Sequence, residues 1–160
     1  MSRFRADHLT SIAKFMRSFD PEAQPTDFIP TTQDIRTVFK RLNEVVWKDS
    51  LPEPEFQVKR QRGAWAMCEG DDKKTIITTT DRFPNQHLFV VVVAHEMVHH
   101  CQWVRLGKMD HGKSFYEWRP ALARYLIPLQ HQSGRGNKID WYHSRNFDWS
   151  KINPAWYDPA

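Results

Sequence analysis

The stretch "VVVVAHEMVHHCQW", residues 90–103, places three histidines and a glutamate at the end of an unbroken apolar run. In an α-helix, residues four apart lie about 40° apart around the axis, so His95 and His99 point to the same side. Two such imidazoles can bind one metal ion, and Glu96 lies beside them, where a carboxylate can hold a water molecule. The competing interpretation is that both histidines are core residues with hydrogen-bonded partners. The spacing H-E-x-x-H favours a zinc site on a helix.

The composition is that of one globular domain, with 160 residues, of which 40% are hydrophobic and 26% charged. The longest apolar run, residues 88–94, is too short to cross a bilayer, and residues 1–15 lack the apolar block of a signal peptide. Cys68 and Cys101 form no CxxC pair, which predicts two free thiols. We therefore expect a cytoplasmic or nucleoid-associated monomer with no membrane partner.

Periodicity predicts an α+β fold. Apolar residues at helical spacing predict a first helix near residues 8–19, and Thr31 followed by Asp34 predicts the capped start of a second helix. A long helix should run from about residue 86 to 106 and end at Gly107. Three short strands are expected in the segments 51–60, 63–68 and 74–80, with a turn at 69–73.

A third histidine follows the long helix in the segment "DHGKSF", residues 110–115. His111 lies twelve residues beyond His99, a gap that suits a loop folding back onto the helix. Three protein ligands and one water form a catalytic zinc site, whereas a structural site closes the fourth position with a protein ligand. Gly112 would let the backbone approach the ion, and Phe115 could pack beneath it. The alternative for His111 is a surface histidine in a loop.

For His100 and Cys101, which follow His99 directly, more than one role is conceivable. His100 would point away from the other histidines, which argues against it as a ligand. Cys101 could act as a nucleophile, although a buried thiol on a helix is usually inert.

The motifs "AHEMVHHCQW" and "DHGKSF" together resemble the SprT-like zinc metallopeptidases, the family that includes the Spartan protease of DNA–protein crosslink repair. The likeness extends upstream to "VFKRLNEVVWKDSLPEPEF" and downstream to "GNKIDWYH", so it covers roughly residues 32–145. The resemblance implies a zincin-like domain at 31–145, preceded by a helix and Pro-containing linker at 1–30. It also implies zinc (Zn²⁺) held by His95, His99 and His111, with Glu96 as the catalytic residue.

The tail at 146–160 departs from the family, because it is dense in aromatic residues and carries no zinc ribbon. These aromatic side chains could stack on exposed bases or could pin the segment onto the domain. The substrate class of the family therefore does not transfer automatically to this chain.

The expected function is that of a zinc-dependent endopeptidase, with a zinc-bound water as nucleophile and Glu96 as general base. Candidate donors for the oxyanion are Tyr116, Tyr142 and His143. A protein substrate would most simply add as a strand along an edge of the sheet, for which residues 74–80 are the expected edge.

DNA-bound or DNA-crosslinked proteins are the substrate class that the resemblance suggests. The densest basic cluster, Lys59, Arg60 and Arg62, is the candidate for weak DNA contact, and a solvated charged turn is the alternative. Two other functions stay open. One is a nucleic-acid-binding module that uses this cluster with other basic residues, namely Arg3, Arg5, Lys40 and Arg41. The other is a structural zinc module without peptidase activity.

Overall fold

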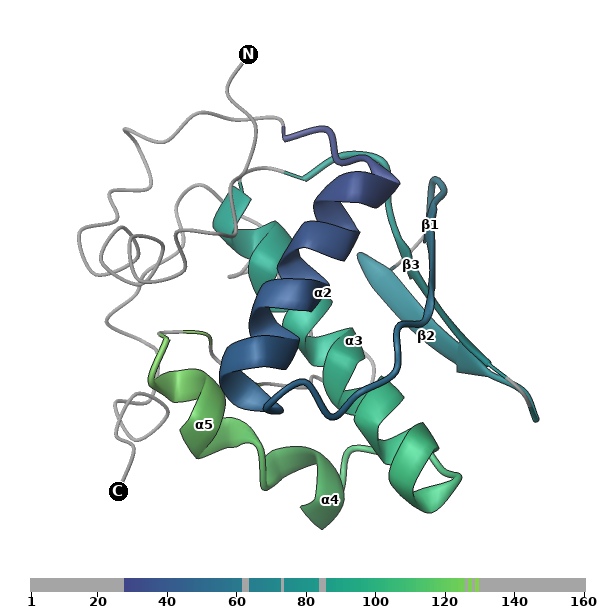
Figure 1. The fold of residues 1–160 in the computed structure, drawn as a ribbon. Coiled ribbons are helices and arrows are strands. Elements are labelled where there is room, and N and C mark those ends of the chain that lie inside the picture. Colours follow the sequence, from purple (N-terminus) through teal and green to yellow (C-terminus); the bar gives the residue numbers. More distant parts are fainter. Residues whose placement is uncertain are drawn as a thin grey trace, which may run out of the picture.

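The computed structural model describes residues 28–61, 64–72, 74–83 and 86–125, together with Ile127 and Leu129. Its fold is α+β (Figure 1). The helices are α2 (Thr32–Val46), α3 (Gln86–Leu106), α4 (Lys113–Tyr116) and α5 (Arg119–Ala123), and the strands are β1 (Glu55–Val58), β2 (Ala66–Gly70) and β3 (Thr75–Thr79). The helix predicted at 8–19 and the aromatic tail at 146–160 lie outside the described residues.

Helix α2 begins where its capping residues predict. The Thr31 hydroxyl accepts a hydrogen bond from the backbone N–H of Asp34 at 3.2 Å, and the Asp34 carboxylate accepts one from the backbone N–H of Thr31 at 2.8 Å. This reciprocal pair supplies side-chain acceptors at the start of the helix, where the regular bonds to the carbonyl four residues earlier have not yet begun. The apolar stripe of α2 is buried in the core, and it consists of Ile35, Val38, Phe39, Leu42 and Val46.

The sheet is mixed, with the strand order β1–β3–β2. Strand β1 pairs with β3 in parallel, and β2 pairs with β3 in antiparallel across the short turn between Asp71 and Lys74. The prediction that residues 74–80 form an edge is therefore wrong, because β3 is the central strand. Proximity to the next helix in sequence does not set the position of a strand in the sheet. Both edges belong to β1 and β2.

Helix α3 is the centre of the fold, as predicted for residues 86–106. It contacts α2, β2, β3 and α4, so apolar residues are needed on most of its surface. This surrounding core explains why the β-branched run Val90–Val93 is helical, since tertiary burial outweighs a modest intrinsic preference for strands. Gly107 ends the helix at φ +68°, a left-handed conformation that glycine adopts without steric cost.

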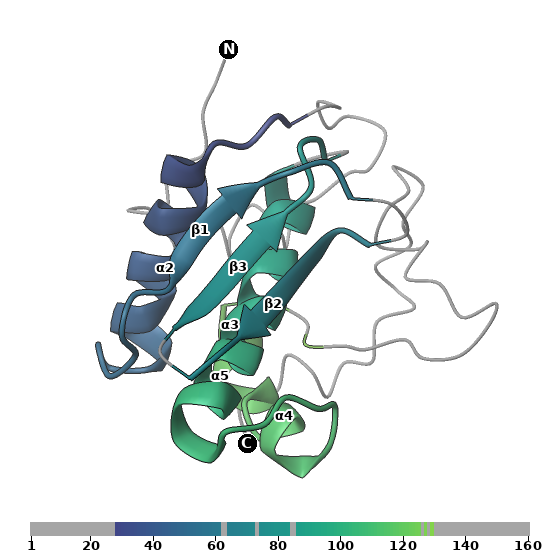
Figure 2. The same cartoon turned by 90° about the vertical axis from the view of Figure 1, so that its right-hand side faces the viewer.

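Helices α2 and α3 lie against one face of the sheet, and α4 and α5 gather at one end (Figure 2). Phe28, at the end of the predicted 1–30 segment, is buried and pairs with Phe83 through two backbone hydrogen bonds of 2.7 and 2.8 Å. Among the described residues, no helix is both long and apolar enough to cross a membrane.

The end of the β2–β3 hairpin is fastened to the last turns of α3. The indole of Trp103 donates a hydrogen bond to the backbone carbonyl of Asp71 at 2.9 Å. A Cβ placed on Gly70 would lie only 2.5–2.7 Å from this indole, so the close approach requires glycine.

Candidate metal centre

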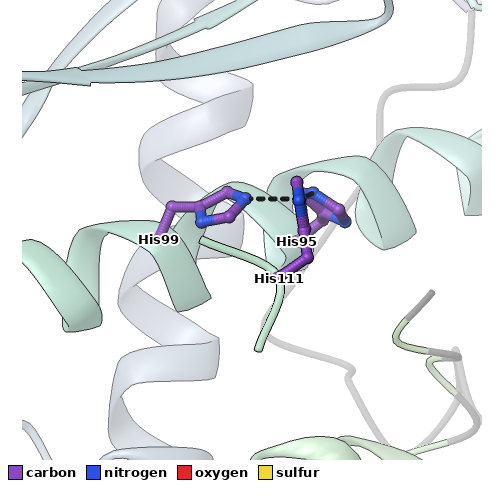
Figure 3. A group of neighbouring side chains, drawn as sticks. All are labelled: His95, His99 and His111. Atoms are coloured by element: carbon purple, nitrogen blue, oxygen red, sulfur yellow. Dashed lines mark hydrogen bonds between the residues drawn. The ribbon is translucent and has the colours of Figure 1, made fainter. Parts of the chain in front are cut away.

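Three histidines bring their Nε2 atoms together beside α3 (Figure 3). The Nε2 atom of His111 lies 3.1 Å from that of His99 and 3.4 Å from that of His95. His95 and His99 come from adjacent turns of α3, whereas His111 comes from the loop between α3 and α4. The three side chains that the motif predicts are therefore close enough to hold one metal ion.

The geometry of this cluster fits a tetrahedral ion. Two nitrogens bound to one zinc at about 2.0–2.1 Å and at the tetrahedral angle are about 3.3–3.4 Å apart. The observed separations of 3.1 and 3.4 Å match this spacing. Three lone pairs directed at one another repel unless a hydrogen or a cation lies between them, so the cluster is suited to accept a cation.

The cluster rests on an aromatic ring, as predicted. The ring centroid of Phe115 lies 4.9 Å from that of each of the three histidines. Phe115 is fully buried, and it belongs to the short helix that begins directly after Gly112. Its packing restricts the rotation of all three imidazoles and dries one side of the site.

Among the described residues, three side chains could serve as ligands in this cluster, and no fourth belongs to it. Cys68 and Cys101 are free thiols that do not belong to it. Burial raises the pKa of both thiols, and for Cys68 the nearby carboxylate of Glu96 adds to the effect. Neither cysteine is therefore in the thiolate form that binds metals or attacks substrates. This finding argues against the alternative in which Cys101 is a nucleophile.

Glu96 is the one acidic side chain of α3 that lies in the interior, with 6% of its surface exposed. Burial raises the pKa of its carboxyl group to about 8. A carboxyl group whose pKa lies near neutral pH is suited to accept and release a proton at physiological pH. Its position next to His95 in the chain keeps this group at the same turn as the first ligand.

His100 is a structural residue. Its Nε2 donates a hydrogen bond to the carbonyl of Pro52 at 2.6 Å, and its Nδ1 accepts one from the hydroxyl of Thr75. Burial lowers the pKa of the imidazole, although the bond to Pro52 acts in the opposite direction. The neutral ring therefore joins α3 to β3 and to the loop before β1, which confirms the expectation that it points away from the ligands.

Sequence reasoning missed Gln102, which is 1% exposed and lies one helical turn after His99. Its amide contacts His99, Asp110 and Ser114, so it connects α3 to the loop that carries His111. The Asp110 carboxylate also accepts the backbone N–H of Gly112 at 3.0 Å, and this bond is the main reason that the pKa of Asp110 is lowered. A glutamine three residues after a predicted ligand on an apolar helix is the signal that could have identified it.

The other predicted site residues are only partly described. Tyr116 lies in α4, where its ring contacts Phe115 and the guanidinium of Arg119. Lys59 and Arg60 are exposed and follow directly after β1. Tyr142, His143 and Arg62 lie outside the described residues, so their predicted roles stay predictions.

The chain was compared with models of protein families, with curated proteins and with solved structures, and none of them matched it.

Proposed function

We propose that the protein is a zinc-dependent endopeptidase with a zincin-like fold, in which His95, His99 and His111 bind the ion. The observation that carries this proposal is the convergence of three imidazole nitrogens at the spacing of a tetrahedral site. Three protein ligands leave one coordination position for water or substrate, which is the composition of catalytic zinc sites. Imidazole nitrogens also suit other transition metals, so the choice of zinc rests on the H-E-x-x-H spacing and on the tetrahedral separations.

The role of general base falls to Glu96. When bound, zinc would supply a Lewis acid and an activated water to the reaction. The buried carboxylate takes up a proton with a pKa near neutrality and can pass it to the leaving amine. A structural zinc module gains nothing from a buried carboxylate, which costs free energy in the folded state. This cost favours the peptidase over the structural alternative.

An extended peptide would pair with an edge of the sheet. Of the two edges, β2 lies against α3, and its inward-facing Cys68 interacts electrostatically with Glu96. Strand β1 instead lies against α2. The edge of β2 is therefore the better candidate to place a scissile bond near the histidines. Main-chain pairing of this kind gives weak sequence preference.

The substrate class we propose is protein bound or crosslinked to DNA. The support is the motif resemblance, the net charge of +4 and the exposed pair Lys59 and Arg60. A protease with weak sequence preference needs another means of selection, and location on DNA would provide it. The alternative, a nucleic-acid-binding module without peptidase activity, leaves the buried carboxylate without a role.

The test separates metal binding from chemistry. Zinc content of the purified full chain should be about one per molecule, and His111→Ala should reduce it strongly. Glu96→Gln should retain zinc and lose cleavage by orders of magnitude, because the amide keeps the shape but cannot accept the proton. The cleavage assay should use an unfolded protein and a DNA-bound basic protein. Peptidase activity of Glu96→Gln at the wild-type level would refute the proposed mechanism.

A further inference from the structure

Gln102 uses the full hydrogen-bonding capacity of its side-chain amide. Its Oε1 lies 2.9 Å from Nδ1 of His99 and 3.3 Å from the backbone nitrogen of Asp110. Its Nε2 donates to Oδ1 of Asp110 at 3.2 Å and to the hydroxyl of Ser114 at 2.9 Å. A glutamine amide offers two acceptor positions and two donor hydrogens, so all four are used.

The contacts with Asp110 fix the orientation of this amide. A backbone N–H can only donate, so the Gln102 atom that faces it must be the oxygen. An ionised carboxylate can only accept hydrogen bonds, and Oδ1 of Asp110 also accepts one from the N–H of Gly112. The Gln102 atom that faces this oxygen must therefore be the nitrogen. A flipped amide would place two donors together and two acceptors together around the buried side chain of Gln102.

The fixed orientation determines the protonation of His99. Because the oxygen of Gln102 faces Nδ1, that nitrogen must carry the hydrogen. In the neutral ring, Nε2 then has a lone pair, and this is the atom that points toward His111. The tautomer that binds a metal ion through Nε2 is thus selected before any ion arrives.

The same amide also holds the loop that carries the third ligand. Asp110 precedes His111 directly, and Ser114 lies three residues after it, so Gln102 contacts the loop on both sides of the histidine. One buried side chain therefore sets the tautomer of one ligand and the position of another.

We propose that Gln102 is a positioning residue of the metal centre, which fixes the His99 tautomer and holds the His111 loop in place. This inference rests on the proposed zinc site. Outer-shell partners of ligating histidines typically change metal affinity 10–100-fold when they are replaced. Gln102→Met keeps the length and approximate volume of the side chain but removes all four hydrogen bonds.

A matched control is available in α2. The buried amide of Asn43 likewise joins a helix to a loop, with hydrogen bonds of 2.9 and 3.1 Å to the backbone of Leu51, but it contacts no ligand histidine. Asn43→Leu should therefore lower the melting temperature without changing zinc affinity. Gln102→Met should lower the melting temperature and also weaken zinc binding about 10–100-fold.

Zinc affinity would be measured on the full chain by competition with a chromophoric chelator. The visible spectrum of the Co²⁺-substituted protein would report ligand geometry independently of activity. The inference predicts an altered Co²⁺ spectrum for Gln102→Met and a wild-type spectrum for Asn43→Leu. It is overturned if Gln102→Met keeps wild-type affinity and spectrum, or if Asn43→Leu loses as much zinc affinity.

A second measurement needs no variant, in case Gln102→Met does not fold. Nitrogen-15 NMR of the metal-free wild type above pH ~7.5 should show His99 with its proton on Nδ1. A proton on Nε2 would overturn the inference. Failure of the wild type to bind zinc would refute the proposed function instead, and the two failures are therefore distinguishable.

Discussion

Replacing Glu96 by glutamine should stabilise the metal-free protein, and the gain should grow as the pH rises from about 5 to 8. The reason is that burial raises the pKa of this carboxyl from an ordinary 4.5 to about 8 in the folded protein. Between these two values the folded protein keeps a proton that the unfolded chain has released. The free energy of unfolding of the wild type therefore falls as the pH rises through this window. The contribution of the Glu96 proton to stability is fully present only below the pKa of the unfolded chain. Glutamine does not titrate and escapes the loss.

The size of the effect follows from the two pKa values. Each pH unit within the window costs the wild type about 1.4 kcal/mol. At pH 7, which lies between the ordinary 4.5 and the folded value of about 8, the accumulated loss is about 3 kcal/mol. A buried amide carries a desolvation cost of its own, of about 1–3 kcal/mol. That cost does not depend on pH, so the change with pH is the cleaner measure.

The assay is denaturant unfolding of chelator-treated wild type and Glu96→Gln at several values between about pH 4.5 and 8.5. Glu69→Gln removes the same formal charge from the exposed surface of β2 and controls for net charge. We expect the difference between Glu96→Gln and wild type to rise steadily with pH. The difference between Glu69→Gln and wild type should stay within about 0.5 kcal/mol.

A flat difference across this pH range would refute the reasoning, because it would mean that Glu96 ionises in the folded protein as easily as in water. Zinc provides a further check. A cation held by the adjacent His95 favours the ionised carboxylate, so saturating zinc should shrink the advantage of Glu96→Gln. Glu96 would then be a residue that lowers stability in the metal-free state and is retained for its chemistry.

Two more predictions concern the hairpin and the basic pair. Gly70→Ala should destabilise the protein by about 1–3 kcal/mol in denaturant unfolding, because the added methyl group would overlap the Trp103 indole. Adding Trp103→Leu should make the combined loss smaller than the sum of the two single losses, and strict additivity would contradict the clash. The double variant Lys59→Glu/Arg60→Glu should weaken DNA binding and slow cleavage of a DNA-bound protein, while hydrolysis of a short peptide is unchanged. An equal slowing of both substrates would count against a DNA-contact role.

Local chemistry explains which parts of the fold could be predicted. The reciprocal hydrogen bonds of Thr31 and Asp34 involve residues three apart, so a four-residue pattern was sufficient to place the start of α2. Gly107 marked the end of α3 for a similarly local reason, its left-handed backbone. The start of α2 and the end of α3 were therefore confirmed.

The order of the strands depends on contacts between distant segments, and here the prediction was wrong. Strand β3 is central because β1 reaches it from one side in parallel while β2 folds back on the other. Nothing in the segment 74–80 itself distinguishes an edge from a centre. The burial of Thr75 likewise depends on a distant segment, because its hydroxyl bonds to His100 only when the sheet packs on α3.

The candidate site divides in the same way. The spacing of His95 and His99, and a loop of suitable length before His111, were enough to predict three converging imidazoles. The partners of Gln102 were not predictable, because they depend on how that loop folds back. Gln102 is excluded from solvent only when this loop packs against α3.

One helical turn explains why the site and the fold cannot be separated. The five consecutive residues of "HHCQW", 99–103, are each rotated by about 100° from the last, so together they face every direction around α3. His99 faces the other histidines, His100 bonds to β3 and to the loop before β1, and Cys101 packs in the core. Gln102 bonds to the loop that carries His111, and Trp103 bonds to the end of the β2–β3 hairpin. Any rotation of α3 that moved His99 by the width of one atom would also strain the bonds of His100, Gln102 and Trp103. The imidazole of His99 is therefore held in place by contacts with four separate parts of the chain, and a metal centre needs rigidity of this kind.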